Sequence, residues 1–365
     1  MKVFGVNEFG ARAASAFAGL VTIALVYVLG KQIASNAVGL ISSLALLSSP
    51  WFTARSRSGN LDIFLTLFFV LSFVLAFKAR KNKKYFYPLG ITLGLLFLTK
   101  TLVPFTIAPA LLFLFINYST YQPALIISLL FFTTWFLTQA FTYPQFILHF
   151  LQIGFPTGKI KTSFMFNLLQ TKSYLHYCIG LIFRPLILLF PVSFLTKDFQ
   201  IFSLIIFTGT FLLPSVLSPK TQIWHLIPVL PFLIIVAISA LHKHRRLFAT
   251  ISTVIISISI TQIFKNWHEI INVPAYISDE AILSKEAGKY PQTLYIDDQF
   301  IPAAVFYSGK NVTNLQYPQV YQYWKFSQPV LLITYQWRLE KENISSSKYT
   351  LLKSDRDKVL VLTNP

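Results

Sequence analysis

Residues 61–79 read LDIFLTLFFVLSFVLAFKA, an apolar run with one acid at its start and one lysine near its end. A run of about 20 apolar residues is the length that an α-helix needs to cross a bilayer. The whole chain shares this character: 54% of its 365 residues are hydrophobic and 12% are charged, against about 25% charged in soluble domains. This composition excludes a soluble cytosolic enzyme and indicates a polytopic membrane protein.

Similar apolar runs lie on both sides of this one. Lipid offers no partner to an unpaired backbone group, so each run is expected to be helical, and the sequence predicts about ten transmembrane helices. The other runs cover residues 12–30, 33–54, 86–99, 101–117, 123–142, 176–195, 199–217, 222–241 and 247–264. The predicted fold class is therefore an all-α polytopic membrane domain over residues 1–264.

The composition changes at about residue 265. Residues 1–264 hold 20 of the 31 Lys and Arg residues but three of the 13 acids, so nearly all of the net charge of +18 lies beside the membrane. This distribution argues against a nucleic-acid partner. Residues 265–365 have balanced charge, a helical pattern at 279–288 and short apolar strands at 293–296, 330–334 and 359–362. They predict a small soluble α/β domain. Asp297 and Asp298 end its first strand and could bind a cation or a sugar, but a role as turn formers is favoured.

Basic loops predict the orientation of the membrane domain in the bilayer. Five of the seven residues Lys78–Lys84 are Lys or Arg, and a second cluster covers Lys243–Arg246. Such clusters in short loops stay in the cytoplasm. An even number of predicted crossings separates them, which puts both on the same side. The loops at 51–61, 143–175 and 218–222, Met1 and the C-terminal domain are then expected outside the plasma membrane.

Polar residues on the predicted outer side are few, and the first group is Arg55, Arg57 and Asp62. One interpretation is structural, with interfacial arginines and an acid at a helix N-terminus. The other is a site in which the arginines bind phosphate and Asp62 fixes their geometry. Lys100 interrupts a long apolar stretch, where an ammonium either reaches the interface or has an anionic partner.

A second group follows the apolar run that ends at 217. Lys220 is the favoured phosphate ligand there, and Trp224 fits either an interfacial aromatic belt or a site. His225 fits a hydrogen-bond donor to phosphate or sugar as well as it fits a packing or capping residue. Arg184 lies inside a predicted span, where an arginine is a functional candidate by default.

Four stretches in order resemble the membrane glycosyltransferases of the C superfamily, in particular the branch with the protein O-mannosyltransferases and the lipid A aminoarabinose transferase. The stretches are Phe4–Arg12, Arg55–Asp62, Gly94–Lys100 and Lys220–Pro231, with His225 where the family usually has Tyr. The similarity covers about residues 1–240, and the soluble tail fits the extracytoplasmic domain of many members.

The resemblance implies transfer of a hexose or pentose from a polyprenyl-phosphate donor to a lipid, glycan or protein acceptor at the outer face, with inversion at the anomeric carbon. It implies that basic residues bind the donor phosphate and that other residues support them. The phosphate ligands would be Arg55, Arg57, Lys100 and Lys220. The supporting residues would be Asp62, Arg12, Arg184, Trp224 and His225.

Family members carry their catalytic Asp in the loop between the first two spans, and this sequence begins after that loop. The expected base would therefore precede Met1, and Glu8 is a poor substitute for it. A chain that starts outside with no preceding span suggests the same, so we expect that the first helix and the first outer loop are missing here and that the chain is inactive without them.

Two other functions stay open at this stage. A transporter or flippase of polyprenyl-linked sugars would share a basic outer cavity and need no base. A non-catalytic membrane subunit would use its tail to bind a partner. The sequence contains no recognisable metal-ligand cluster, and a divalent cation is the one cofactor left open.

Overall fold

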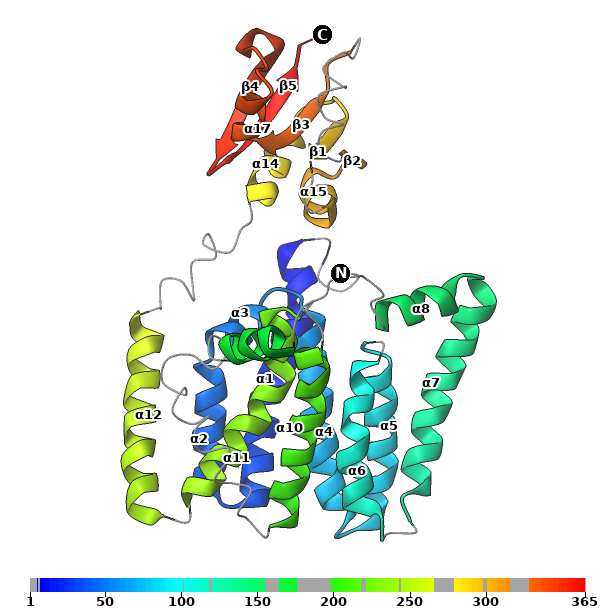
Figure 1. Ribbon diagram of the computed structural model, residues 1–365, viewed down its shortest axis with the longest axis vertical. Coiled ribbons are helices and arrows are strands. Elements are labelled where there is room, and N and C mark those ends of the chain that lie inside the picture. Colours follow the sequence, from blue (N-terminus) through cyan, green and yellow to red (C-terminus); the bar gives the residue numbers. More distant parts are fainter. Residues whose placement is uncertain are drawn as a thin grey trace. The chain divides into compact units, whose positions relative to one another are not determined.

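The structure is a computed structural model of the full chain, shown in Figure 1. It describes residues 5, 7–100, 102–117, 120–154, 164–175, 198–217, 221–242, 244–265, 279–297, 301–315 and 328–364. The chain forms two compact units, Met1–Lys265 and Asn266–Pro365, which are described separately.

The first unit is helical throughout its described residues. Its α-helices are α1 (Glu8–Ile33), α2 (Asn36–Leu47), α3 (Pro50–Ser56), α4 (Leu61–Ala79), α5 (Phe86–Phe97), α6 (Ala108–Phe115), α7 (Gln122–Thr142), α8 (Phe146–Gly154), α10 (Phe199–Leu217), α11 (Leu230–His242) and α12 (Arg245–Lys265). Short 3-10 helices are η1 (Lys83–Tyr85), η2 (Val103–Ile107) and η4 (Ile223–Val229), and a further helix covers 164–175.

Five of the described helices are long and apolar enough to cross a membrane, and a sixth crossing is possible if α2 and α3 count as one bent span. The predicted run at 176–195 lies outside the described residues. Every other predicted run contains a helix, although α5 and α6 are short. The helical character and multi-pass membrane nature predicted from the sequence are confirmed.

The predicted run at 33–54 is not one continuous helix, because the chain bends by 71° between α2 and α3. Pro50 has no N–H to continue the hydrogen-bond ladder of α2. Ser49 instead caps a new helix, since its hydroxyl accepts a hydrogen bond from the backbone N–H of Phe52 at 3.4 Å. Proline also interrupts regular α-helix at Pro104 and Pro228, which lie in the 3-10 helices η2 and η4 that precede α6 and α11.

The centre of the first unit is an aromatic cluster from α4, α10 and α11. The ring of Phe207 lies 4.8 Å from Phe69, 5.4 Å from Phe73 and 4.6 Å from Phe232, measured between centroids. Each of these side chains is fully buried. Such edge-to-face and tilted pairs stabilise the packing beyond the area that they bury, so the cluster fixes the helices whose ends carry the site.

Small residues allow two helix pairs to approach closely. On α5, Gly90 and Gly94 form a G-x-x-x-G pattern that faces α7, and such patterns let membrane helices pack backbone to backbone. A Cβ atom at Gly90 would lie 2.9 Å from the Cα of Ala124. Between α1 and α2, a Cβ atom at Gly30 would lie 2.8 Å from the Cα of Gly39. Larger side chains at these positions would separate the helices.

Figure 1 shows two ends of the first unit. The α4–α5 and α11–α12 connections, which contain or adjoin the two basic clusters, lie at the same lower end in this view. The short helix α3, the end of α5 and the start of η4 lie at the opposite end. At the lower end, the His242 imidazole hydrogen-bonds the Ser35 hydroxyl at 3.1 Å and so joins α11 to the α1–α2 turn.

The second unit contains a five-stranded mixed sheet in the order β2-β1-β3-β5-β4. Its strands are β1 (Leu294–Asp297), β2 (Val312–Leu315), β3 (Leu331–Tyr335), β4 (Tyr349–Asp355) and β5 (Lys358–Thr363), and its helices are α14 (Asp279–Ala287), α15 (Ile301–Ser308), α17 (Gln336–Lys341) and the 3-10 helix η7 (Ser346–Lys348). Strands β2, β1 and β3 are parallel, whereas β5 runs antiparallel to β3 and β4. The small sheet is therefore confirmed.

Asp297 is not the turn former that the sequence favoured. It is the last residue of β1 and fully buried. Its carboxylate accepts a hydrogen bond from the Thr334 hydroxyl at 2.8 Å and forms an ion pair with Arg338 of α17. A buried carboxylate needs such partners because burial removes its hydration. Asp297 thus connects β1 to β3 and α17, while Asp298 lies outside the described residues.

The close contact of α5 with α7 gives a first prediction. Replacing Gly90→Ala is expected to lower the free energy of unfolding by about 1–3 kcal/mol, because the new methyl group meets the backbone of α7, which cannot move aside locally. Thermal unfolding of the purified full chain in detergent measures this loss.

Gly209→Ala is the matched control. A Cβ atom at Gly209, in α10, has no atom within 4 Å. Alanine at this helical position is expected to raise stability by about 0.5–1 kcal/mol. Equal thermal midpoints for the Gly90→Ala variant and the unmodified protein would show that α5 and α7 do not pack as described.

Candidate functional site

The site is built on the short helix α3 and the turn that follows it. Trp51 and Arg55 are four residues apart on α3, so their side chains lie on the same face. Gly59 has a φ of 68° and a Cβ atom there would lie 3.1 Å from the Ala11 carbonyl oxygen. This left-handed conformation favours glycine, and it turns the chain from α3 into α4.

Asp62 lies in the first turn of α4 and is 5% exposed. The Asn60 side chain caps this helix by accepting a hydrogen bond from the Asp62 N–H at 2.7 Å. The Asp62 carboxylate in turn accepts a hydrogen bond from the Lys100 ammonium, with an Nζ–Oδ1 distance of 2.7 Å. The helix N-terminus also favours a negative charge at this position.

Lys100 follows the end of α5, where the chain leaves the helix before η2. The Thr99 hydroxyl donates to the Leu96 carbonyl at 2.6 Å and satisfies one of the free acceptors at the helix end. The Lys100 side chain is 28% exposed. Its anionic partner is thus Asp62, although the sequence grouped Asp62 with Arg55 and Arg57. The two residues are 38 positions apart and meet because α4 and α5 are antiparallel neighbours.

Trp224 and His225 complete the group from the start of η4. The guanidinium carbon of Arg55 lies 4.4 Å from the ring centroid of Trp224 and 5.4 Å from that of Trp51. The His225 ring caps its own helix, since Nδ1 accepts a hydrogen bond from the Gln222 N–H at 3.3 Å. The charges of Lys100, Asp62 and Arg55 all act on the His225 ring, so these side chains form one electrostatic group.

Of the remaining predicted residues, two are described and two are not. Arg57 is the C-cap residue of α3, two positions after Arg55. Arg12 lies on α1 and forms an ion pair with Glu8 at 3.9 Å. Lys220 and Arg184 lie outside the described residues.

Sequence reasoning missed Trp51 and Ser15. The signal for Trp51 was the Ser-Pro start of a helix at 49–50, which puts Trp51 and Arg55 on one face. The hydroxyl of Ser15, on α1, donates to the carbonyl oxygens of Ser56 at 2.8 Å and Arg55 at 3.3 Å. Nothing in the sequence around Ser15 indicates this contact.

We call the side chains of Trp51, Arg55, Asp62, Lys100, Trp224 and His225 the outer cluster. With a neutral imidazole it contains two cations and one carboxylate, and hence a net charge of +1. Within the described residues, no group of three or more His, Cys, Asp or Glu side chains is placed to hold a metal ion. The net positive charge of the outer cluster suits it to an anion, and Arg and Lys side chains are common ligands of phosphate.

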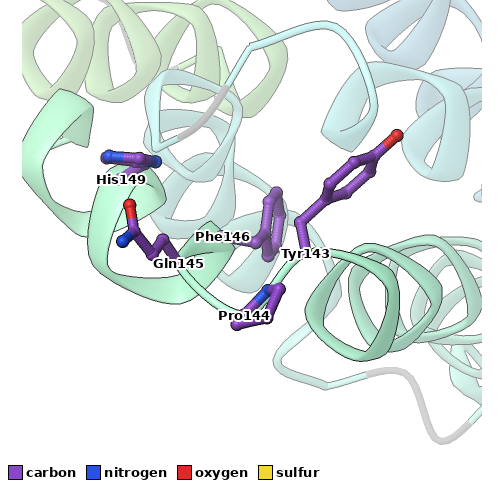
Figure 2. Close-up of a pocket in the computed structure, with 5 residues that line it drawn as sticks. All are labelled: Tyr143, Pro144, Gln145, Phe146 and His149. Atoms are coloured by element: carbon purple, nitrogen blue, oxygen red, sulfur yellow. The ribbon is translucent and has the colours of Figure 1, made fainter.

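A separate hollow of 520 Å³ lies at the corner between α7 and α8. Figure 2 shows its lining residues, with Gln145, just before α8, close to His149 of α8 and the Tyr143 ring directed away from them. Pro144 and Phe146 complete the lining. This lining has no Lys or Arg side chain, so the hollow lacks the cations of the outer cluster.

Comparisons with known proteins match part of the chain to a family of mannosyltransferases and the whole chain to a known fold. The family model described as dolichyl-phosphate-mannose-protein mannosyltransferase matches residues 1–140. The Bacillus subtilis (strain 168) protein named "Putative mannosyltransferase YkcB" is 29% identical over 116 residues, which is 31% of this chain. That match spans only 16% of the length of YkcB.

Two solved structures of ArnT from Cupriavidus metallidurans share the fold. The one bound to undecaprenyl phosphate has a TM-score of 0.74 at 14% identity, and the match covers 99% of this chain and 85% of that one. The apo structure has a TM-score of 0.73 at 13% identity with the same coverage. The resemblance seen in the sequence thus agrees with both comparisons: residues 1–140 match the dolichyl-phosphate-mannose-protein mannosyltransferase model, and the chain as a whole has the fold of ArnT.

Proposed function

We propose that this protein transfers a sugar from a polyprenyl-phosphate donor to an acceptor oxygen, with the donor phosphate bound at the outer cluster. The observation that carries the proposal is that Lys100 pairs with Asp62 while the charges of Arg55, Asp62 and Lys100 all act on the ring of His225, beside Trp224. The fold likeness to an ArnT structure bound to undecaprenyl phosphate supports this class of donor. The sugar is a hexose or pentose, and the acceptor is a lipid, a glycan or a protein.

The chemistry requires a cationic site for the leaving group. The acceptor oxygen forms a new bond to the anomeric carbon, and the bond from that carbon to the phosphate oxygen breaks. The polyprenyl phosphate leaves with the bonding electrons and gains negative charge, which nearby cations stabilise more in the transition state than in the ground state. Arg55 and Lys100 supply these cations, and Arg57 and Lys220 are proposed as further phosphate ligands.

The acceptor proton must pass to a base. The first unit contains three acids, and each has a structural partner in the described residues: Glu8 pairs with Arg12, Asp62 pairs with Lys100, and Asp198 caps α10 through the N–H groups of Gln200 and Ile201. We therefore assign the base to none of these acids. Asp62 acts as a support that holds Lys100 in place.

The orientation of the unit is proposed from its charges. Both basic clusters lie at the end opposite α3 (Figure 1), which fits a cytoplasmic side there under the positive-inside rule. The outer cluster then faces the outside of the plasma membrane, and the C-terminal unit is extracytoplasmic. Accessibility of single cysteines introduced at Lys81 and Ser58 to an impermeant thiol reagent tests this orientation.

A direct test follows the fate of the donor. The full chain is reconstituted in proteoliposomes with a polyprenyl-phosphate-linked sugar labelled in the sugar, together with candidate acceptors. A transferase releases free polyprenyl phosphate in step with labelled acceptor. Movement of intact donor across the bilayer with no release would identify a flippase instead, and binding without either would identify a non-catalytic subunit.

The cations of the outer cluster give a second prediction. Replacing Arg55→Ala or Lys100→Ala in the active protein is expected to lower turnover by about 10²- to 10³-fold, as the loss of a charge-stabilising donor does in other enzymes. Lys81→Ala is the matched control, because Lys81 is an exposed cation in the loop between α4 and α5, away from the outer cluster. Unchanged turnover in both site variants would remove these residues from the mechanism.

The Lys100–Asp62 pair gives a third prediction. Replacing Asp62→Asn leaves the ammonium of Lys100 without its anion, and we expect a loss of about 1–3 kcal/mol in the free energy of unfolding. The double variant Asp62→Asn with Lys100→Met removes both charges and is expected to regain stability but not turnover. Thermal unfolding and transfer assays on the same preparations separate the two effects, and equal losses of stability in the single and double variants would contradict the pairing.

A further inference from the structure

We propose that Trp51 and Trp224 are positioning residues that hold the guanidinium of Arg55 ready for the donor phosphate. This inference rests on the proposed function, because it concerns the same phosphate site. Arg55 would touch the phosphate directly, whereas the two indole rings act only through Arg55.

The two indoles reach Arg55 from different parts of the chain. Trp51 comes from the preceding turn of α3, and Trp224 comes from the start of η4. Their ring centroids are 6.4 Å apart, with an angle of 32° between the ring planes. The guanidinium lies closer to Trp224, at 4.4 Å, than to Trp51, at 5.4 Å. Both distances are within the range in which a cation is attracted to an aromatic face.

The backbone that carries Arg55 is fixed as well. Ser15 of α1 donates its hydroxyl proton to the carbonyl oxygens of Arg55 and Ser56. Gly19, one turn further along α1, leaves room for Ser56, because a Cβ atom at Gly19 would lie 2.5 Å from the Ser56 Oγ. Helix α1 thus holds the end of α3 in place while the indoles hold the side chain.

The support from aromatic rings leaves the charge of Arg55 available. Within the described residues, Arg55 forms no ion pair, and the neighbouring carboxylate of Asp62 is hydrogen-bonded to Lys100. A ring that stacks on the face of a guanidinium does not use the N–H groups, which lie in its plane. Those N–H groups can therefore donate to two phosphate oxygens, which is the geometry that an arginine fork favours.

An interfacial belt is the alternative explanation for the two tryptophans. If the tryptophans are belt residues, they contact lipid, and replacing them has the same effect on phosphate binding whether or not Arg55 is present. A positioning residue loses its effect once Arg55 has been removed. The two explanations therefore differ in whether the effects of the substitutions are coupled.

The test measures binding of undecaprenyl phosphate to the purified full chain in nanodiscs. Trp224→Ala is expected to weaken binding about tenfold, in line with a partly desolvated cation–π contact. Trp224→Phe is expected to retain most of the affinity because it keeps an aromatic face, whereas Trp224→Leu is expected to lose as much as Trp224→Ala. Trp135→Ala is the matched control, since Trp135 lies on α7 against Phe146 rather than against Arg55.

A double-mutant cycle completes the test. In the Arg55→Ala background, Trp224→Ala is expected to cause no further loss of affinity. Additive losses, or equal binding by the Leu and Phe variants, would overturn the inference. Trp51→Ala provides the same cycle from α3 if Trp224→Ala does not yield folded protein, as judged by its thermal unfolding.

The outcomes also separate this inference from the proposed function. If Arg55→Ala binds the lipid phosphate as well as the unmodified protein does, Arg55 is not a phosphate ligand and both proposals fail at this residue. If Arg55→Ala loses affinity while both tryptophan variants keep it, the phosphate site stands and the positioning role is wrong.

Discussion

An ammonium at the end of a membrane helix needs an anion nearby, and the contact between Lys100 and Asp62 meets this need. It joins the end of α5 to the start of α4 and places a buried carboxylate against a half-buried ammonium. The electrostatic attraction is stronger in such surroundings than in water. The positions of Arg55 and His225 depend on this pair, because α3 leads directly into α4 and η4 packs against it.

The two cations of the outer cluster are supported in different ways. Lys100 is held by a carboxylate, which offsets its charge at contact distance, whereas Arg55 is held by indole rings and feels the same carboxylate only from further away. One cation is thus stabilised by an ion pair, and the other forms no ion pair within the described residues and can attract an incoming anion. A site made only of ion pairs would be stable but neutral. In a site made only of unpaired cations, the like charges would repel one another and destabilise the fold.

Much of the fold could be predicted from the sequence because lipid allows few solutions. Apolar runs such as 61–79 and 123–142 became α4 and α7 with nearly the same bounds. Prolines redirected the chain where a continuous span was expected, at Pro50 above all. In the second unit, the buried strands β1, β3 and β5 were expected, while β2 and β4 were missed because edge strands lack a continuous apolar pattern.

The candidate site was harder to predict than the fold. Residue types and loop positions singled out Arg55, Asp62, Lys100, Trp224 and His225, but pairings over long sequence separations were out of reach. The Asp62–Lys100 pair and the contact of Arg55 with Trp224 arise from helix packing, which periodicity does not encode. Trp51 was missed because the sequence analysis expected one apolar run over 33–54 and no new helix at Pro50, which puts Trp51 and Arg55 on one face.

The short linker between α3 and α4 has a consequence for how this protein varies among its relatives. Gly59 is in a conformation that other residues rarely adopt, and Asn60 caps the next helix. Adding or removing one residue here would rotate α3 against α4 and carry Arg55 away from the indole of Trp224. The length of this linker is therefore under tighter constraint than its composition, unlike most surface loops, in which insertions are readily tolerated.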